Sequence, residues 1–437
     1  MTEAILIRGA NLEGAGRADL LLIDGVIADA GVGLSRAGAT VVDADGMVAL
    51  PGLVDLHVHL REPGLESAET VASGSRAGSA GGYTALFAMP NTAPPADTAG
   101  AVEQQLALGE RAGRLHVQPI GAVTAGRAGT RLAELGAMAH SRARVRLFSD
   151  DGACVADPVI MRRALEYVKA FGGAIAQHSE DPRLTSGAQM NDGPLSAELG
   201  LGGWPSVAEE SIIARDVLLT EHVGSRLHVC HVSTAGSVEV LRWAKRRGVA
   251  VTAEVTPHHL MLTEQEVRGY DARYKVNPPL RRDEDVAALR EALADGTIDA
   301  VATDHAPHPV EAKHCEWDRA APGMIGLDVA LRVVQSTMVD TGMMDWKGVA
   351  RVMSSNPARI GRLADQGRAI APGEPANLVL HDRAATEAPV AAADLHGLSG
   401  NSPYLGRPLP GRTRWTFYRG RATLRDGDVV ETEEVHP

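Results

Sequence analysis

Two histidines separated by one residue, His57 and His59, stand in the stretch of this chain with the greatest capacity for chemistry. They lie within an apolar run, residues 53–60, that Pro63 and Gly64 bring to an end. Alternate residues of a β-strand point to the same side, so the two imidazoles are expected about 6–7 Å apart on one face. There they can bind one metal ion if other parts of the chain supply further ligands. Taken alone, the pair is equally compatible with a histidine-rich strand end that binds no metal.

The segments that must position these histidines alternate between short apolar runs and helix-length amphipathic stretches. The apolar runs are residues 53–60, 83–89, 116–123, 145–149, 174–178, 227–232, 249–255 and 299–302, and the amphipathic stretches include 158–171, 205–222, 237–247 and 283–295. Eight strands alternating with helices predict an α/β fold, a (β/α)8 TIM barrel over residues 51–365. The alternative, a doubly wound sheet, needs a glycine-rich phosphate loop after its first strand, which this chain lacks.

Both ends of the chain predict short strands and tight turns instead. Asp24-Gly25 and Asp426-Gly427 each separate two short runs, and an Asp-Gly in this position is the strongest short-range signal for a β-hairpin. The N-terminal strands are too few to be stable alone. We therefore predict one small β-sandwich domain formed by residues 1–50 together with residues 366–437.

The overall composition favours an enzyme over a protein that binds nucleic acid or membranes. The 437 residues include 43 Lys and Arg against 55 Asp and Glu, a net charge of −12. We therefore expect no nucleic-acid partner and no membrane partner, and an anionic substrate must be held by a few local arginines. The three widely spaced cysteines and the absence of a recognisable signal peptide predict a cytoplasmic protein without disulfides.

The carboxyl ends of all barrel strands meet at one mouth, and most of these ends carry side chains that bind metals or polar ligands. They are His57, His59, Arg61, Asn91, Asp150, Asp151, His178, His231, Asp304 and His308. Each one alone is better explained as a capping aspartate or a packed histidine, but their convergence by chance is improbable. Nitrogen and oxygen ligands without thiolates favour zinc or a similar divalent ion. Four histidines and a shared carboxylate suffice for two ions with hydroxide between them as nucleophile, and Asp304 would be the general acid/base.

The same residues belong to motifs that resemble those of dihydroorotases, in their longer bacterial type I form. The motifs are His-Val-His-Leu-Arg-Glu-Pro-Gly, Met-Pro-Asn-Thr, Asp-Asp-Gly, the isolated His178 and His231, and Asp-His-Ala-Pro-His. The resemblance spans nearly the whole chain, and residues 373–380 are similar to the sandwich segment of the amidohydrolase superfamily. It implies a zinc enzyme of de novo pyrimidine (UMP) biosynthesis, which reversibly cyclises N-carbamoyl-L-aspartate to L-dihydroorotate.

The resemblance also implies a role for each site residue. The metal ligands would be His57, His59, Asp151, His178, His231 and Asp304. Asp151 and hydroxide would bridge two zinc ions, although occupancy by one ion is an alternative, and Asp304 would also be the catalytic acid/base. The substrate's α-carboxylate would be held by Arg61, Asn91 and His308, its ring or carbamoyl group by Asn277, and further contacts would come from backbone amides at Pro322 and Gly323. From the residues alone, Asn277 is better explained as a turn residue before Pro278.

Two departures from the family pattern bear on these assignments. Many members of the superfamily bridge their metals with a carbamylated lysine at the end of the fourth strand, and this chain has no lysine there. Asp151 is the available substitute, and its choice over Asp150 rests on the resemblance. The loop 309–327 differs from the Pro-Phe-Gly-Ile run of many relatives, which weakens the assignment of Pro322 and Gly323.

Other functions compatible with the motifs are those of a hydantoinase, a dihydropyrimidinase or an allantoinase, or of an inactive homologue that serves as a scaffold. Arg61 and the missing lysine disfavour the first three, and the complete set of ligands disfavours the last. As partners we expect a small-molecule substrate and a second copy of the chain in a homodimer. Association with aspartate transcarbamoylase is a further candidate.

Overall fold

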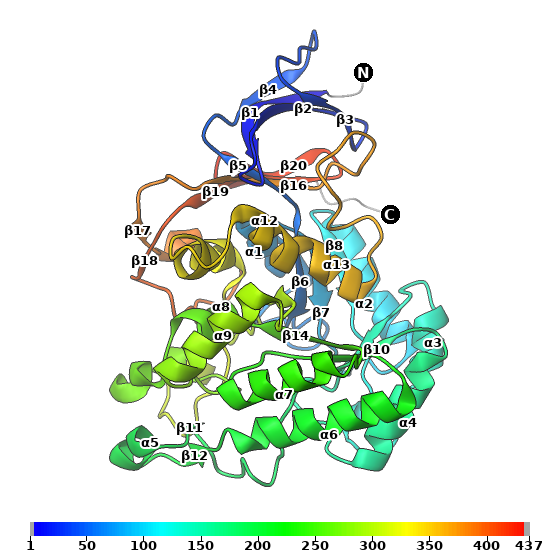
Figure 1. Cartoon of the computed structure of the whole chain (residues 1–437), viewed down its shortest axis with the longest axis vertical. Helices are drawn as coiled ribbons and strands as arrows, with labels where there is room; N and C mark the ends of the chain where they lie inside the picture. The colour runs from blue at the N-terminus through cyan, green and yellow to red at the C-terminus, as the bar shows by residue number, and fades with distance from the viewer. Residues whose placement is uncertain (1–3, 432–437) are drawn as a thin grey trace.

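The computed structural model describes residues 4–431 and confirms the predicted barrel (Figure 1). Its parallel strands are β6 (Leu53–Val58), β7 (Tyr83–Ala88), β8 (His116–Pro119), β9 (Leu147–Phe148), β10 (Ala174–Gln177), β13 (Leu227–Val229), β14 (Val251–Val255) and β15 (Ala300–Val301). They pair in this order, and the bridges Gly121↔Phe148 and Val58↔His305 join the two arcs into a closed ring. The carboxyl ends of all eight strands therefore face one mouth.

Helices surround the ring (Figure 1). The longer ones are α1 (Val71–Gly81), α2 (Ala99–Ala112), α4 (Pro158–Lys169), α6 (Val207–Val223), α7 (Ala235–Arg246) and α9 (Asp283–Asp295). The shorter ones are α3 (Leu135–His140), α5 (Pro194–Leu199), α8 (Pro257–Met261), α10 (Val310–Lys313), α11 (Ala330–Val334), α12 (Trp346–Ala350) and α13 (Asn356–Gly361). At α4, Asp157 accepts from the amides of Val159 and Ile160, so its carboxylate satisfies donors that the first helical turn leaves open.

The two ends of the chain form one nine-stranded sheet, as their hairpin signals predict. Its strands are β1 (Ile5–Leu12), β2 (Arg17–Ile23), β3 (Val26–Gly31), β4 (Thr40–Asp43), β5 (Val48–Pro51), β16 (Leu378–Asp382), β19 (Arg412–Tyr418), β20 (Arg421–Arg425) and β21 (Asp428–Val429). The order is β21-β20-β19-β16-β5-β1-β2-β3, with β4 beside β1. In Figure 1 this sheet curls into an upper layer of β1 to β4 and a lower layer around β16 and β19. The predicted limits of this domain, residues 1–50 and 366–437, stay a prediction.

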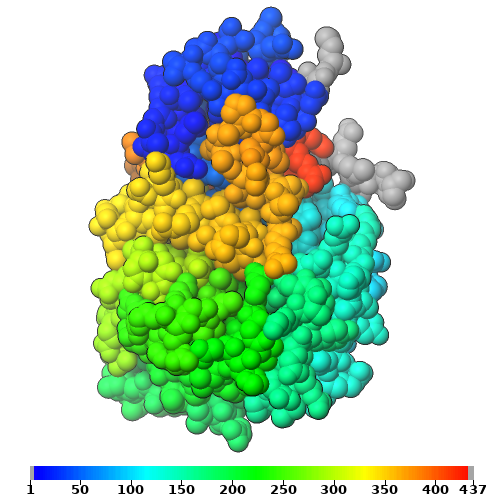
Figure 2. Space-filling model, turned by 45° about the vertical axis from the view of Figure 1, so that its right-hand side comes forward, coloured from blue at the N-terminus to red at the C-terminus, as the bar shows by residue number. Residues whose placement is uncertain are grey.

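Three apolar clusters hold these parts together. The largest joins the barrel strands to the surrounding helices, and a second joins Val54 and Phe87 of the strands to Ala358 and Ile360 of α13. A third, which includes Ile7 and Phe417, fills the space within the terminal sheet. Figure 2 shows the N-terminal strands (blue) at one end of the molecule, with the segment after α13 (orange) reaching from the barrel onto them.

Small elements complete the described chain: β11 (Met190–Asn191), β12 (Gly203–Trp204), β17 (Ala388–Pro389) and β18 (Pro408–Leu409). Within residues 4–431, no helix combines the length and the apolar character that crossing a bilayer requires. In the same part of the chain, Cys154, Cys230 and Cys315 form no disulfide.

The contact between the terminal sheet and the barrel includes a buried histidine. His381 of β16 is fully buried, and its Nε2 lies 2.8 Å from Oε1 of Gln335, on a π-helical turn (Gln335–Val339) of the barrel. Burial lowers the pKa of His381 to about 3. The folded chain therefore disfavours protonation of this side chain more strongly than the unfolded chain does.

We expect His381→Gln to reduce the loss of stability that the protein suffers in acid. A depressed histidine pKa contributes stability that is fully present above the unfolded value, about 6.5, and is lost as pH falls towards the folded value, at up to about 1.4 kcal/mol per pH unit. Urea unfolding at pH 7.5, 6 and 5 measures the slope. The exposed His140→Gln is the control, and equal slopes in all three proteins would contradict the assignment to His381.

Candidate active site

The predicted site residues gather at the carboxyl-terminal mouth of the barrel, around a cavity of about 220 Å³. All of them line this cavity except His57, which is fully buried beneath it. The lining residues among them are His59, Arg61, Asn91, Asp151, His178, His231, Asn277, Asp304, His308, Pro322 and Gly323. They follow seven different strands or loops, so only a closed barrel brings them together.

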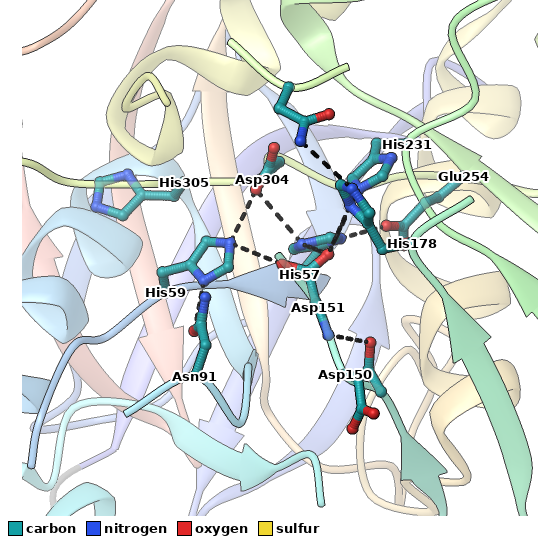
Figure 3. Close-up of polar contacts among 12 residues, drawn as sticks. His57, His59, Asn91, Asp150, Asp151, His178, His231, Glu254, Asp304 and His305 are labelled. Carbon is teal, nitrogen blue, oxygen red and sulfur yellow. Dashed lines mark hydrogen bonds and ion pairs between the residues drawn. The ribbon is translucent and has the colours of Figure 1, made fainter. Parts of the chain in front are cut away.

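Asp151 occupies the centre of a group of four imidazoles (Figure 3). Its Oδ1 lies 3.4 Å from His57 Nε2, from His178 Nδ1 and from His231 Nε2, and its Oδ2 lies 3.4 Å from His59 Nε2. Two groups of ligand atoms thus share this carboxylate, one with His57 and His59, the other with His178 and His231. The atoms within each group lie within 4.8 Å of one another.

Two buried atoms in this group have no hydrogen-bond partner among the described residues: Oδ1 of Asp151 and Nε2 of His57. Orphaned buried polar atoms are rare in folded proteins because their desolvation is costly. Imidazole nitrogens and carboxylate oxygens are also the ligands that divalent transition metals prefer. The cluster is therefore a candidate metal-binding site, and its imidazole and carboxylate groups suit a divalent transition metal.

Asp304 closes the cluster on the side of the last strand. Its Oδ1 lies 3.0 Å from His59 Nε2 and 3.4 Å from His57 Nε2. The backbone of Asp304 has a φ of +47°, and those of His231 and Arg61 have φ values of +31° and +61°. Residues with side chains rarely adopt this left-handed region, and such strain is concentrated at functional sites.

The charges in the cluster balance one another. Burial on its own raises the pKa of Asp151 and Asp304, but the neighbouring imidazoles outweigh it and lower both values. Burial lowers the pKa of His178, but the neighbouring carboxylates of Asp151 and Glu180 outweigh it and raise the pKa to about 10. The carboxylates are thus ionised and raise the pKa of His57 and of His178, which favours protons on these two rings, whereas burial lowers the pKa of His59. Because metal ligands must be deprotonated, a bound cation would displace these protons.

A second set of polar groups fixes the orientation of the imidazoles. Nδ1 of His57 lies 2.7 Å from Glu254 on β14, and Nδ1 of His59 lies 2.8 Å from Oδ1 of Asn91. Nε2 of His178 lies 2.8 Å from Glu180. Such partners set which ring nitrogen carries the proton and which faces the ligand. Glu254 and Glu180 were not among the site residues predicted from the sequence, although a glutamate inside the apolar seventh barrel strand is a signal for Glu254.

Asp150 and Asp151 point in different directions. Asp150 Oδ1 accepts from the amides of Val123 and Thr124 at 2.9 and 3.0 Å, and its Oδ2 accepts from the Thr124 hydroxyl. Figure 3 shows this carboxylate turned away from the imidazoles. Asp150 therefore holds the loop after β8, and Asp151 alone of the pair reaches the cluster.

The other predicted contacts line the same cavity, and Asn277 Nδ2 lies 3.4 Å from His178 Nε2. The Arg61 Nε donates to the Pro307 carbonyl at 3.1 Å, which leaves the end of the guanidinium directed at the cavity. Asn277 donates from Nδ2 to Glu180 at 3.2 Å, and its Oδ1 is buried without a partner among the described residues. Asn277 precedes a cis proline and also lines the cavity, so it is both a turn residue and a candidate ligand contact.

The structure offers no free backbone amide at positions 322 and 323, so a substrate contact through these amides stays a prediction. Pro322 has no amide hydrogen. The amide of Gly323 donates to the Lys275 carbonyl at 2.9 Å and is not available to a ligand. Both residues nevertheless line the cavity, where a side chain at Gly323 would come within 2.7 Å of His308 Nε2. Gly323 therefore contributes space rather than a donor.

Comparison with known proteins places this geometry in context. The Dihydro-orotase-like family model matches residues 46–237, and the Amidohydrolase family model matches residues 207–403. The chain is 68% identical over 430 residues to the dihydroorotase of Leifsonia xyli, with 98% of each chain covered. It is 65% identical to that of Streptomyces coelicolor, with 97% and 99% covered, and 53% identical to that of Mycobacterium tuberculosis, with 98% and 99% covered.

Solved structures with a similar fold include an L-hydantoinase from Arthrobacter aurescens, with a TM-score of 0.87 and 25% identity over 99% of this chain and 98% of that one. A dihydropyrimidinase from Brevibacillus agri has a TM-score of 0.85 and 21% identity, covering 98% of this chain and 96% of that one, and shows the fold alone.

We predict that Asp151→Ala weakens metal binding by more than about tenfold, since losing even an indirect partner of a metal ligand costs about 10–100-fold. Zinc titration of the metal-free protein, followed by elemental analysis after dialysis, measures the change. Asp150→Ala is the matched control. It should lower the melting temperature, because two loop amides lose their acceptor, yet keep the zinc. Equal loss of zinc in both variants would refute the distinction between the two aspartates.

Proposed function

The chain belongs to the dihydroorotase family of the amidohydrolase superfamily, and from this premise we propose that it interconverts N-carbamoyl-L-aspartate and L-dihydroorotate. It is a cyclic amide hydrolase that acts on a small molecule. The observation that carries the proposal is the cavity itself, which has two histidine pairs sharing Asp151 on one side and a directed arginine on the other. The first side suits hydrolysis of an amide, and the second suits a substrate carboxylate.

We propose that the metal is zinc and that two ions are bound, through His57 and His59 on one side of Asp151 and His178 and His231 on the other. Ligands of nitrogen and oxygen support this choice. Cys230 lies within reach of His57, but burial raises the pKa of its thiol, which keeps it protonated. When bound, such ions lower the pKa of water and polarise a carbonyl oxygen.

Asp304 is the proposed general acid and base. Its carboxylate lines the cavity, is buried, and is held ionised by His57 and His59. In the hydrolytic direction, water adds to the ring amide carbon while its proton passes to Asp304. The carbon–nitrogen bond then breaks, and the same carboxyl returns the proton to the departing nitrogen. In the biosynthetic direction these steps reverse and release water.

Arg61, Asn91 and His308 are the proposed contacts of the α-carboxylate. Asn91 accepts from His59 with its oxygen, so its NH₂ group is left to donate. His308 commits Nε2–H to the Pro322 carbonyl at 2.9 Å, and burial lowers its pKa to about 3. The neutral ring then offers an acceptor at Nδ1. A contact between this ring and a carboxylate therefore requires uptake of a proton, which the substrate's negative charge would favour.

A hydantoinase, dihydropyrimidinase or allantoinase activity is the second candidate, since the fold is shared with two such enzymes. Turnover of L-dihydroorotate by the metal-loaded protein, compared with hydantoin and allantoin, tests the proposal directly. We further propose a cytoplasmic location, which the unpaired cysteines support. A homodimer and an association with aspartate transcarbamoylase remain predictions from the sequence.

Asp304→Asn should retain zinc and lose activity. The amide keeps an oxygen that can face His59 but cannot carry the proton, so turnover should fall by at least about 10²-fold. Steady-state hydrolysis of L-dihydroorotate, with zinc content measured on the same samples, checks both parts. Near-normal turnover in the variant would remove Asp304 from this role.

Arg61→Met should reduce kcat/KM for L-dihydroorotate by about 10²-fold or more, since charge-assisted hydrogen bonds contribute about 1.5–3 kcal/mol each. Arg61→Lys should recover only part of this, because an ammonium cannot reproduce the guanidinium fork. Zinc content should not change.

The uncharged ring 5,6-dihydrouracil is the control for Arg61. A defect confined to the carboxylated ring supports the assignment, whereas equal defects on both rings, or none, would overturn it. A surface ion pair of Arg61 with Glu62 or Glu66 is not a competing explanation. Those carboxylates accept instead from the amides of Val71 and Gly64.

A further inference from the structure

The loop 309–327 forms one wall of the active-site cavity, and its shape is set by side chains outside the proposed catalytic group. Pro322 and Gly323 are its lining residues. The loop begins at the end of the last barrel strand, makes the short helix α10, and returns so that Met324 pairs with His305. The position of the returning segment relative to His308 and Asn277 must therefore be fixed by contacts with other side chains.

Lys313, at the end of α10, lies against this returning segment. Its Nζ is 2.7 Å from the Ala321 carbonyl, 2.8 Å from the Gly323 carbonyl and 3.2 Å from the Lys275 carbonyl. An ammonium has three donors and no acceptor. All three donors are therefore matched by backbone carbonyls from two different segments.

The carbonyls of three successive residues are held in this way by side chains. Lys313 holds those of Ala321 and Gly323, and His308 holds that of Pro322 between them. The Lys275 carbonyl accepts from both Lys313 and the Gly323 amide, so the same contact ties the loop to the segment carrying Asn277. Displacement of the loop would move two cavity walls and the hydrogen-bond partner of His308.

The charge of Lys313 has no carboxylate within ion-pair distance among the described residues, although the side chain is only 9% exposed. Burial, followed by the nearby Lys275, lowers its pKa to about 7. A buried ammonium is costly unless its donors are satisfied. The carbonyl contacts supply that compensation, so the lysine and the loop conformation depend on each other.

We propose that Lys313 is a positioning residue that fixes the Pro322–Gly323 wall, and through it His308, in the geometry that receives the substrate. The identity of the substrate in this inference rests on the proposed function. The role of Lys313 in holding the loop does not depend on it. Lys313 is not among the residues that line the active-site cavity. We therefore expect it to affect substrate binding more than the chemical step.

Lys275, on the neighbouring segment that carries Asn277, offers a matched control. It is 8% exposed, and its Nζ donates to the carbonyls of Trp317 at 2.6 Å and Asp318 at 3.2 Å. Neither of these residues lines the cavity. Lys275→Met therefore removes a buried ammonium without removing a donor to the cavity wall, whereas Lys313→Met removes the donor to the Ala321 and Gly323 carbonyls.

The experiment compares the zinc-loaded wild type with Lys313→Met, Lys313→Arg and Lys275→Met. Lys313→Met should raise KM for L-dihydroorotate by about tenfold or more, with kcat within about threefold, because the loss of charged hydrogen bonds weakens a binding wall. Lys313→Arg, which keeps the charge and donors, should recover part of this. Lys275→Met should keep KM within about threefold, since its carbonyl partners lie away from the cavity.

Hydrogen exchange of the Gly323 amide supplies a readout that does not depend on activity. It should be faster in Lys313→Met than in the wild type and in Lys275→Met. Unchanged exchange and KM in Lys313→Met would overturn the proposal, and so would equal effects of the two methionine variants. If the wild type does not turn over L-dihydroorotate, the proposed function fails, and the exchange comparison still decides the role of Lys313.

Discussion

The burial of the Asp151 carboxylate among four imidazoles is the interaction on which the rest of the structure depends. Its oxygens reach side chains that follow β6, β10 and β13, while the aspartate itself follows β9. These strands are far apart in the chain, and parallel pairing around a closed ring brings their ends together. In a protein interior, where the effective dielectric constant is about 4–20, such a group of charges is stable only if each charge has a partner of opposite charge or a hydrogen bond. The barrel therefore has to close accurately for the cluster to exist.

A second layer of polar side chains around the cluster supplies partners for the imidazoles. Glu254 contacts both His57 and His228, so one carboxylate on β14 orients a ring on β6 and a ring on β13. Asn91 and Glu180 do the same for His59 and His178. The rings of His57 and His59 are thus held by groups on other strands, and the ring of His178 is held by a glutamate that follows the same strand. Rigid elements of this kind keep functional groups in place more accurately than loops do.

Much of this could be predicted from the sequence because it depends on local patterns. The spacing of His57 and His59 follows from the period of a strand, the alternation of segments indicates the barrel, and Asp-Gly marks the hairpins. Glu254 could not be assigned, because its partners His57 and His228 are distant in the chain. Glu180 lies only two residues after His178, but the conformation that turns it onto this ring is set by the fold of the strand end. The conformation of the loop 309–327 was equally out of reach. It is fixed by Lys313 and Asn401, which both donate to the Gly323 carbonyl. Lys313 precedes Gly323 in the chain, and Asn401 follows it by many residues.

The sheet made by the two chain ends has a consequence for how the protein is made. β5 lies between β1 and β16, with Leu50 opposite Val379 and Ala49 opposite Leu380. On a ribosome, the first five strands emerge long before their partner does. Until then β5 presents an unpaired apolar edge, the kind of edge that invites association with other chains. The barrel can assemble during this interval, and completion of the sheet is therefore a late step of folding, in which the chain closes on its own beginning.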